Sequence, residues 1–241
     1  MSSDIEFRTI ESAPTLFLAL SRLKDQLMSY HIRDLAYGYM VNPNSPDQHD
    51  VAMVTTLSDK LMSFYGKHGG LEFDPVADQV GGALEPFSVD LEALVNGSGA
   101  KKFIAHPPMR AFLRADYSLF WSFPFSDEET LGYGALTLHL LPGVRLEDAD
   151  TDELMQIANR FHREMKRGGQ LGLLFDLSEL ETETLRVCAT GQPAKQIAAA
   201  QDVSVRAIEM RLEACRVKLK ARNTMEAIFK ATVYGILNNP G

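Results

Sequence analysis

The sequence predicts a chain of class α+β, with a mixed N-terminal domain and an all-helical C-terminal domain. Three observations support this prediction. Two pairs of strand-like runs occupy the first 140 residues, a glycine-rich stretch follows a long amphipathic helix, and four short helical segments close the chain. A length of 241 residues is enough for two modest domains, each with its own core. We therefore expect a first domain over 1–166, a linker over 167–176 and a second domain over 177–241.

The first domain is expected to begin with a helix and a hairpin. Leucines recur near helical spacing between Pro14 and Tyr30. Two strand-like runs follow, LAYGYMV from Leu35 and DVAMVTT from Asp50, and the turn-rich segment NPNSPDQ separates them. This order predicts a hairpin with a long loop.

Helices and a second hairpin are expected next. The pattern predicts a helix from Ser58 to Tyr65 and shorter helices after Pro75, Val89 and Pro107. The runs SLFWSFPF and LGYGALTLHL then flank the turn SDEET. Two hairpins in one domain favour an antiparallel sheet.

A long helix is expected from Asp148 to Lys166, with acidic residues at its start and basic ones at its end, as the helix dipole prefers. Its apolar stripe consists of Leu154, Ile157, Phe161 and Met165. We expect a homodimer formed by this helix or by an edge of the sheet. The alternative that the stripe faces the protein's own core stays open. The glycine-rich segment RGGQLGLLF after this helix is expected to be a linker.

The last segment predicts four compact helices with a sharp turn between the second and third. Ser178 and Glu181 form a capping box, Gly191 ends the first helix and Pro193 suits the first turn of the second. Ser204 is expected to cap the third helix, and a fourth should run from residue 224 to residue 236. The core-facing stripe of the third helix is Ile208, Leu212, Cys215 and Leu219. This arrangement describes a helix-turn-helix module, whose third helix lies in the DNA major groove.

Charge and composition fit a DNA-binding module attached to an acidic domain. The net charge is −8, but residues 177–241 carry 9 Lys and Arg against 7 Asp and Glu, and residues 1–176 carry 15 against 25. No apolar run is long enough to span a bilayer and no signal peptide opens the chain, so a cytoplasmic protein is expected. Cys188 and Cys215 match no metal spacing and are expected to be small buried residues in a reducing compartment.

The chain resembles the LuxR family. The segments LSELETETLRVCATG, AKQIAAAQDVS, VRAIEMRLEACRVKL and KARNTMEA resemble its C-terminal DNA-binding domain over some sixty residues. FYGKHGGLEFDPV, together with the order of helices and strands, is similar to the autoinducer-binding domain of the quorum-sensing branch. The resemblance implies an αβα sandwich that binds an acyl-homoserine-lactone-like signal, dimerises and regulates transcription. Its implied partners are double-stranded DNA, a second copy of the chain, the small-molecule signal and RNA polymerase.

The resemblance also implies a ligand site with fewer polar groups than the family pattern. Tyr65 and Asp74 match the family's pocket tyrosine and the aspartate that accepts the signal's amide N–H. Leu57 and Leu61 stand where the family has a tyrosine and a tryptophan, and the tryptophan is the usual donor to the lactone carbonyl. An ordinary N-cap before Pro75 is the alternative role for Asp74. Trp121 is expected either to line the pocket or to pack in the core. The expected ligand-binding residues are Leu57, Leu61, Tyr65, Asp74, Phe87, Phe120, Trp121 and Ser122. A hydrophobic signal, and not a short-chain lactone, is therefore expected.

The DNA-binding surface is expected on the second and third helices of the C-terminal module. At about 100° per residue, Arg206, Met210, Glu213 and Val217 point away from the core stripe. Lys195, Arg211 and Lys218 are spaced to meet phosphates, whereas Glu209 and Glu213 are a liability near them. The expected DNA-binding residues are Lys195, Ser204, Arg206, Glu209, Met210, Arg211, Glu213 and Lys218.

Three other classes of protein differ from this interpretation in the sequence features that they require. An enzyme is disfavoured because the six histidines are scattered, no nucleophile or phosphate-loop motif is present and no cofactor or metal is expected. A NarL-type receiver-domain regulator would need alternating β and α units, where this chain predicts hairpins. A LuxR-like regulator that acts without a lactone, constitutively or under partner control, remains open because Leu57 and Leu61 replace hydrogen-bonding aromatics.

Overall fold

A computed structural model describes residues 5–40, 51–96, 107–127, 132–168 and 170–237 of the chain. It divides into two compact units, Met1–His162 and Arg163–Gly241. The division falls inside helix α8 (Asp148–Arg167). The stretch expected to be a linker contains a 3₁₀ helix, η4 (Gln170–Phe175).

The first unit is built on a five-stranded antiparallel sheet with the order β2-β1-β5-β4-β3. The two predicted hairpins are present: β1 (Ile32–Met40) pairs with β2 (Val51–Thr55), and β4 (Leu119–Asp127) pairs with β5 (Gly132–Leu140). The edge strand β3 (Phe87–Asp90) was not expected from the sequence. It has only four residues, too few to display a period of two.

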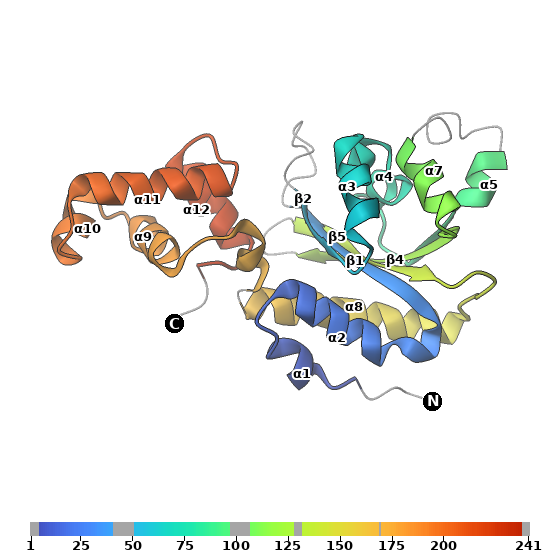
Figure 1. Ribbon diagram of the computed structural model, residues 1–241. Coiled ribbons are helices and arrows are strands. Elements are labelled where there is room, and N and C mark those ends of the chain that lie inside the picture. The colour runs from blue at the N-terminus through green and yellow to red at the C-terminus, as the bar shows by residue number, and fades with distance from the viewer. Residues whose placement is uncertain (1–4, 41–50, 97–106, 128–131, 169, 238–241) are drawn as a thin grey trace. The chain divides into compact units, whose positions relative to one another are not determined.

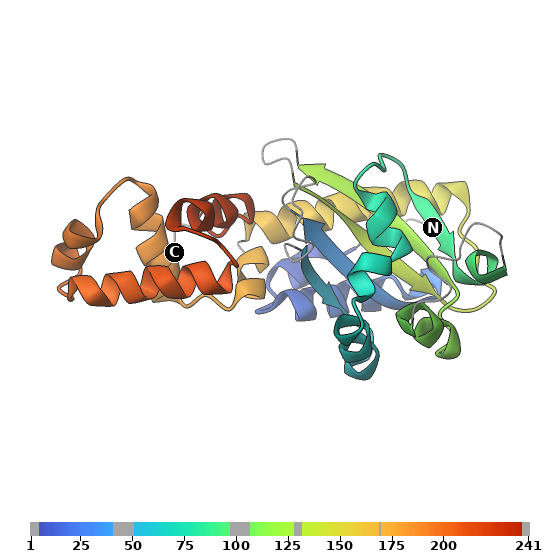
Figure 2. The ribbon, with the colours of Figure 1, turned by 90° about the horizontal axis from the view of Figure 1, so that it is seen from above.

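Helices cover both faces of the sheet, which confirms the αβα sandwich that the family resemblance implied. In Figures 1 and 2, α2 and α8 lie on one face, and α3, α4, α5 and α7 lie on the other. These helices, together with α1 and the 3₁₀ elements η1 and η3, have the following bounds: α1 (Phe7–Glu11), α2 (Leu16–Gln26), η1 (Met28–Tyr30), α3 (Asp59–Lys67), η3 (Gly70–Phe73), α4 (Pro75–Val80), α5 (Leu91–Asn96) and α7 (Pro107–Arg114). No helix in the described part of the chain is both long and apolar enough to cross a membrane.

The apolar stripe of α8 faces the chain's own interior. Leu154, Ile157, Phe161 and Met165 are all buried. The ring of Phe161, for example, meets the ring of Tyr37 from β1 edge-on at 5.5 Å. The prediction that this stripe forms a dimer surface was therefore wrong, because a side chain already covered within its own chain has no apolar area left for a partner.

The second unit contains the four predicted helices, α9 (Glu179–Ala189), α10 (Ala194–Ala200), α11 (Val205–Lys218) and α12 (Thr224–Val233). The capping box of Ser178 and Glu181 is present, and Gly191 takes the left-handed conformation that ends α9, with φ of 88°. Pro193 is the N-cap of α10 and lies just before its first turn.

The turn between α10 and α11 has a specific backbone requirement. Asp202 adopts a left-handed φ of 53°, and the Ser204 hydroxyl accepts a hydrogen bond from the Ala207 amide to start α11. Ile197 and Ala198 of α10 pack against Ile208 of α11 in a small core. This turn fixes the second and third helices of the module relative to each other.

Candidate functional site

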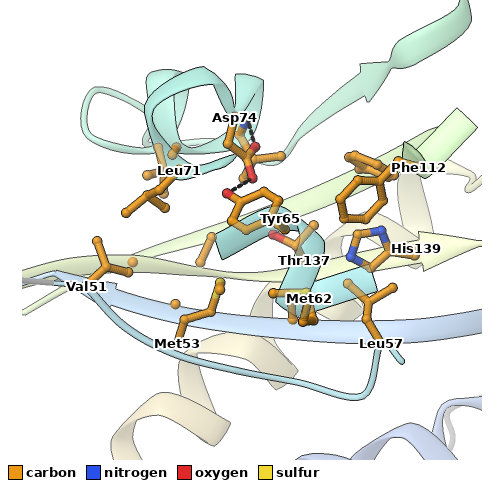
Figure 3. Close-up of a pocket in the computed structure, with 18 of the residues that line it drawn as sticks. Val51, Met53, Leu57, Met62, Tyr65, Leu71, Asp74, Phe112, Thr137 and His139 are labelled. Carbon is orange, nitrogen blue, oxygen red and sulfur yellow. Dashed lines mark hydrogen bonds between the residues drawn. The ribbon is translucent and has the colours of Figure 1, made fainter. Parts of the chain in front are cut away.

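A mostly apolar cavity lies over the face of the sheet that α3, α4 and α7 cover. It encloses about 730 Å³ of space free of atoms, part of it continuous with solvent. Figure 3 shows Val51 and Met53 at one end of the view and Leu57, Phe112 and His139 at the other. The lining residues are Ala36, Gly38, Met40, Val51, Met53, Leu57, Met62, Tyr65, Leu71, Asp74, Val76, Ala77, Val80, Met109, Phe112, Phe120, Gly134, Ala135, Thr137 and His139.

The hollow exists because two neighbouring strands carry small residues on this face. The register of β1 and β5 places Gly38 opposite Ala135 and Ala36 opposite Thr137. A Cβ atom added at Gly38 would meet no atom within 4 Å. Small side chains at the centre of the sheet therefore leave an open space above it. Larger residues from the covering helices enclose this space only at its margins.

Tyr65 and Asp74 form a polar pair in this pocket. The Tyr65 hydroxyl donates to Oδ2 of Asp74 at 2.7 Å, and Oδ1 of Asp74 accepts the Val76 amide at 2.8 Å. Burial raises the pKa of the Asp74 carboxyl above its usual value. Burial, reinforced by the nearby Asp74 carboxylate, also raises the pKa of Tyr65 well above its usual range. Asp74 therefore caps α4, and it also lines the pocket; its expected bond to the amide of a signal stays a prediction.

Half of the residues expected to bind ligand line the pocket: Leu57, Tyr65, Asp74 and Phe120. Leu61 lies in the apolar cluster around the pocket, and Phe87 packs against that cluster. Ser122 is buried with its hydroxyl 3.0 Å from that of Thr137, and only Thr137 of the two lines the cavity.

Trp121 does not line the pocket and is only half-buried, so neither of its two expected positions holds. It pairs with Leu138 on β5 and its ring stacks on Phe123 at 6.3 Å. Because strand residues alternate between faces, Trp121 lies on the face opposite Phe120.

The sequence interpretation missed His139, which lines the pocket from β5. Its ring stacks on Phe112 at 6.0 Å and meets the edge of Phe120 at 4.5 Å. Burial lowers the pKa of His139 to about 4, so the imidazole is neutral near pH 7. The alternation of GYGALTLHL could have indicated it, since His139 shares a strand face with Ala135 and Thr137.

The side of the second unit that is expected to face DNA presents few exposed cations. Of the residues expected there, six are exposed: Lys195, Ser204, Arg206, Glu209, Met210 and Glu213. Met210 exposes 64% of its surface, and Val217 on the same face exposes 68%. This surface combines isolated charges with bare apolar side chains.

Arg211 and Lys218 have partners inside the domain, which qualifies the phosphate role expected for them. Arg211 donates to the side-chain oxygen of Gln201 at 2.7 Å. Lys218 donates to Oε2 of Glu181 at 2.8 Å and to the Asp176 carbonyl at 2.6 Å. The hydrogen bond to Glu181 raises the pKa of Lys218. Both cations tie α11 to neighbouring segments of the domain.

Glu213 is likewise offset by a neighbour. Nη1 of Arg216 lies 2.6 Å from Oε2 of Glu213, one turn apart on α11. Of the two glutamates expected to repel phosphates, Glu213 therefore has its charge partly compensated within the helix.

Comparisons with known proteins agree with this geometry. Residues 176–231 match the family model described as bacterial regulatory proteins, luxR family. A crystal structure of Escherichia coli SdiA matches with a TM-score of 0.53 and 16% identity, over 96% of this chain and 95% of that one. A structure of SdiA in complex with octanoyl-rac-glycerol matches with a TM-score of 0.51 and 18% identity, over 99% of each chain. No curated protein matched the sequence.

A four-helix module with a sharp turn between its second and third helices has the arrangement of a helix-turn-helix DNA-binding domain. Residues 176–231 of this module match the luxR family of bacterial regulatory proteins, and the chain as a whole shares the fold of SdiA.

The position of Tyr65 depends on the absence of a side chain at Gly70, which gives a first prediction. A Cβ at Gly70 would lie 2.4 Å from the Tyr65 ring. We expect Gly70→Ala to displace this ring and lower the free energy of unfolding by about 1–3 kcal/mol. The control is Gly66→Ala in α3, where a Cβ meets no atom within 4 Å and stability should stay equal or rise by up to about 1 kcal/mol. Urea unfolding measures both variants, and equal stabilities for the two would contradict the prediction.

Proposed function

We propose that this chain is a LuxR-type transcription regulator that senses a hydrophobic signal of the acyl-homoserine-lactone type in the N-terminal pocket and binds DNA as a dimer. The observation that carries the proposal is the apolar cavity with the hydrogen-bonded Tyr65–Asp74 pair in its wall, in a domain whose fold is shared with SdiA. That neighbour has been solved in complex with octanoyl-rac-glycerol, a molecule with an acyl chain and a polar head. Contact with RNA polymerase, which the family resemblance implies, is part of the same proposal.

The chemistry of Asp74 supports a signal that donates a hydrogen bond. Oδ2 of Asp74, which points at the Tyr65 hydroxyl, accepts one bond from it, although a carboxylate oxygen can accept two. A half-buried carboxyl in apolar surroundings gains from a further donor, and the amide N–H of an acyl signal supplies one. The surrounding Met, Leu and Val side chains suit its chain.

One observation favours the alternative of a regulator that needs no lactone. Tyr65 and Asp74 already satisfy each other at 2.7 Å, so the polar pair is stable without a ligand. Leu57 lines the pocket and Leu61 packs beside it, and neither can hold a lactone carbonyl.

Identification of the bound molecule separates these alternatives. We expect mass spectrometry of an extract of the purified protein to show a hydrophobic amphiphile other than a short-chain lactone. We further expect Asp74→Asn, which retains an N-cap residue, to keep the fold and to weaken binding of amide-bearing signals. Unchanged binding in this variant would leave Asp74 with a capping role alone, and a bound short-chain acyl-homoserine lactone would contradict the expected ligand class.

Assembly gives a separate prediction. The sequence predicted a dimer through the long helix or through an edge of the sheet. Because the stripe of α8 is buried, the sheet edge remains. Within the described residues, the edge strands β2 and β3 each pair with a neighbour on one side only. We expect sedimentation to show a homodimer at micromolar concentration. A monomer, with and without lipid extract, would count against this assembly.

The DNA-binding surface predicts different outcomes for two cations. Lys195 is exposed, so Lys195→Ala should weaken binding to cognate and scrambled duplexes alike and reduce the salt dependence by roughly one ion. Arg211→Ala should weaken DNA binding together with the stability of the domain, because Arg211 holds Gln201. Titrations at two salt concentrations, with thermal unfolding of each variant, distinguish the two effects. Loss of stability in Lys195→Ala would contradict the assignment.

The variant Glu209→Gln, which removes an anionic side chain, is tested in the same titrations as Lys195→Ala, which removes a cationic one. If Glu209 holds α11 back from phosphates, Glu209→Gln raises affinity for the scrambled duplex. If it accepts from a cytosine, the change costs about 1–3 kcal/mol at one base pair only. A wild-type protein that binds no duplex above background would refute DNA binding through this surface.

A further inference from the structure

The strongest unexplained feature of the pocket is the hydrogen-bonding capacity of His139. The side chain is 4% exposed, and neither ring nitrogen has a hydrogen-bond partner among the described residues. Around the ring lie Phe112, Tyr117 and Phe120, whose ring centroids are 4.5–6.0 Å away. An imidazole buried in this way loses its bonds to water and gains none from the protein, which is unfavourable for the folded state.

Tyr117 and Asp34 do not relieve this deficit. The Tyr117 hydroxyl donates to Oδ2 of Asp34 at 2.6 Å, and Oδ1 of Asp34 accepts from Lys24 at 2.9 Å. Both groups are thus engaged with partners other than His139. Since His139 lines the cavity, a molecule inside it can reach the ring.

The pocket also restricts the charge of that molecule. Among the described lining residues the only charged type is Asp74, and no Lys or Arg is present. A carboxylate entering this space would be removed from water beside an acidic group and without a cation, which is strongly unfavourable. A neutral head group meets no such penalty.

The neutral form of His139 defines the complementary group. Because the pKa of His139 is lowered to about 4, the ring at pH 7 offers one N–H donor and one bare nitrogen acceptor. A carbonyl oxygen can accept from the donor, and a hydroxyl can serve either nitrogen whichever tautomer is present.

We propose that His139 is a specificity-determining residue that hydrogen-bonds the head group of a neutral acyl amphiphile, and that the pocket discriminates against the free fatty acid of the same chain. The inference rests on the proposed signal-binding function and assigns a chemical class to the signal. Acyl-homoserine lactones and monoacylglycerols both satisfy this chemistry, since each joins an acyl chain to uncharged oxygen groups.

Binding of three probes with one chain length tests the inference. Isothermal titration of the full-length protein at pH 7 would use N-dodecanoyl-homoserine lactone, monododecanoyl-glycerol and dodecanoic acid, each below its micelle concentration. We expect at least one neutral probe to bind, and dodecanoic acid to bind at least tenfold more weakly. The tighter of the two neutral probes identifies the source of the head group.

Two variants assign the effect to His139. His139→Leu should weaken binding of the neutral probe by about twofold to thirteenfold, the range expected for one hydrogen bond. The same variant should melt at an equal or higher temperature without ligand, because an unsatisfied buried polar group has been removed. His139→Gln, which keeps a donor and an acceptor, should recover part of the affinity.

The outcomes separate this inference from the function on which it rests. If the wild type binds a neutral probe and His139→Leu binds it equally well, or if dodecanoic acid binds as tightly, the role of His139 is refuted while signal binding stands. If the wild type binds none of the three probes, the acyl-binding function fails and the inference fails with it. Should His139→Leu not fold, His139→Gln and the fatty-acid comparison still decide the question.

Discussion

The alternation of side chains along β5 is the constraint on which the first domain depends. This strand is the centre of the five and pairs with both β1 and β4. Leu136, Leu138 and Leu140 are buried on one face, and Ala135, Thr137 and His139 are on the other. The leucine face needs an apolar cover, which α2 and α8 provide. The second face has less apolar bulk and is where the cavity forms. A shift of one residue would exchange the faces and place the leucines in the pocket.

The same alternation explains how far the sequence could predict the site. Long periodic elements such as α8 and both hairpins were evident, because hydrophobic patterning identifies them without tertiary information. The direction in which the α8 stripe points could not be predicted, because a stripe that faces a partner and a stripe that faces the core have the same spacing. Trp121 and His139 show the same limit. Their positions relative to the cavity depend on which sheet face the helices α3, α4 and α7 cover, and no local pattern specifies that.

Asp74 illustrates how one residue can satisfy two demands. Its Oδ1 atom caps the first turn of α4, and its Oδ2 atom holds the Tyr65 hydroxyl inside the pocket. From the sequence, capping and acceptance of a signal's amide were alternatives, because a DP pair at a helix start is explained by capping alone. In the structure, the cap and the bond to Tyr65 reinforce each other. The cap fixes the backbone of Asp74, and this in turn fixes the direction in which its second oxygen points.

The C-terminal domain divides its cations between holding the fold and facing solvent. Arg211 and Lys218 brace α11 from inside, and Arg216 offsets Glu213, so a count of basic residues overstates the charge available to phosphates. Non-specific attraction to DNA grows with the number of phosphates neutralised, and a face with few free cations gains little from it. The exposed Met210 and Val217 gain nothing from phosphates but can pack against thymine methyl groups in the major groove. If this face enters the major groove as proposed, its discrimination between sequences rests on shape and apolar contact more than on charge.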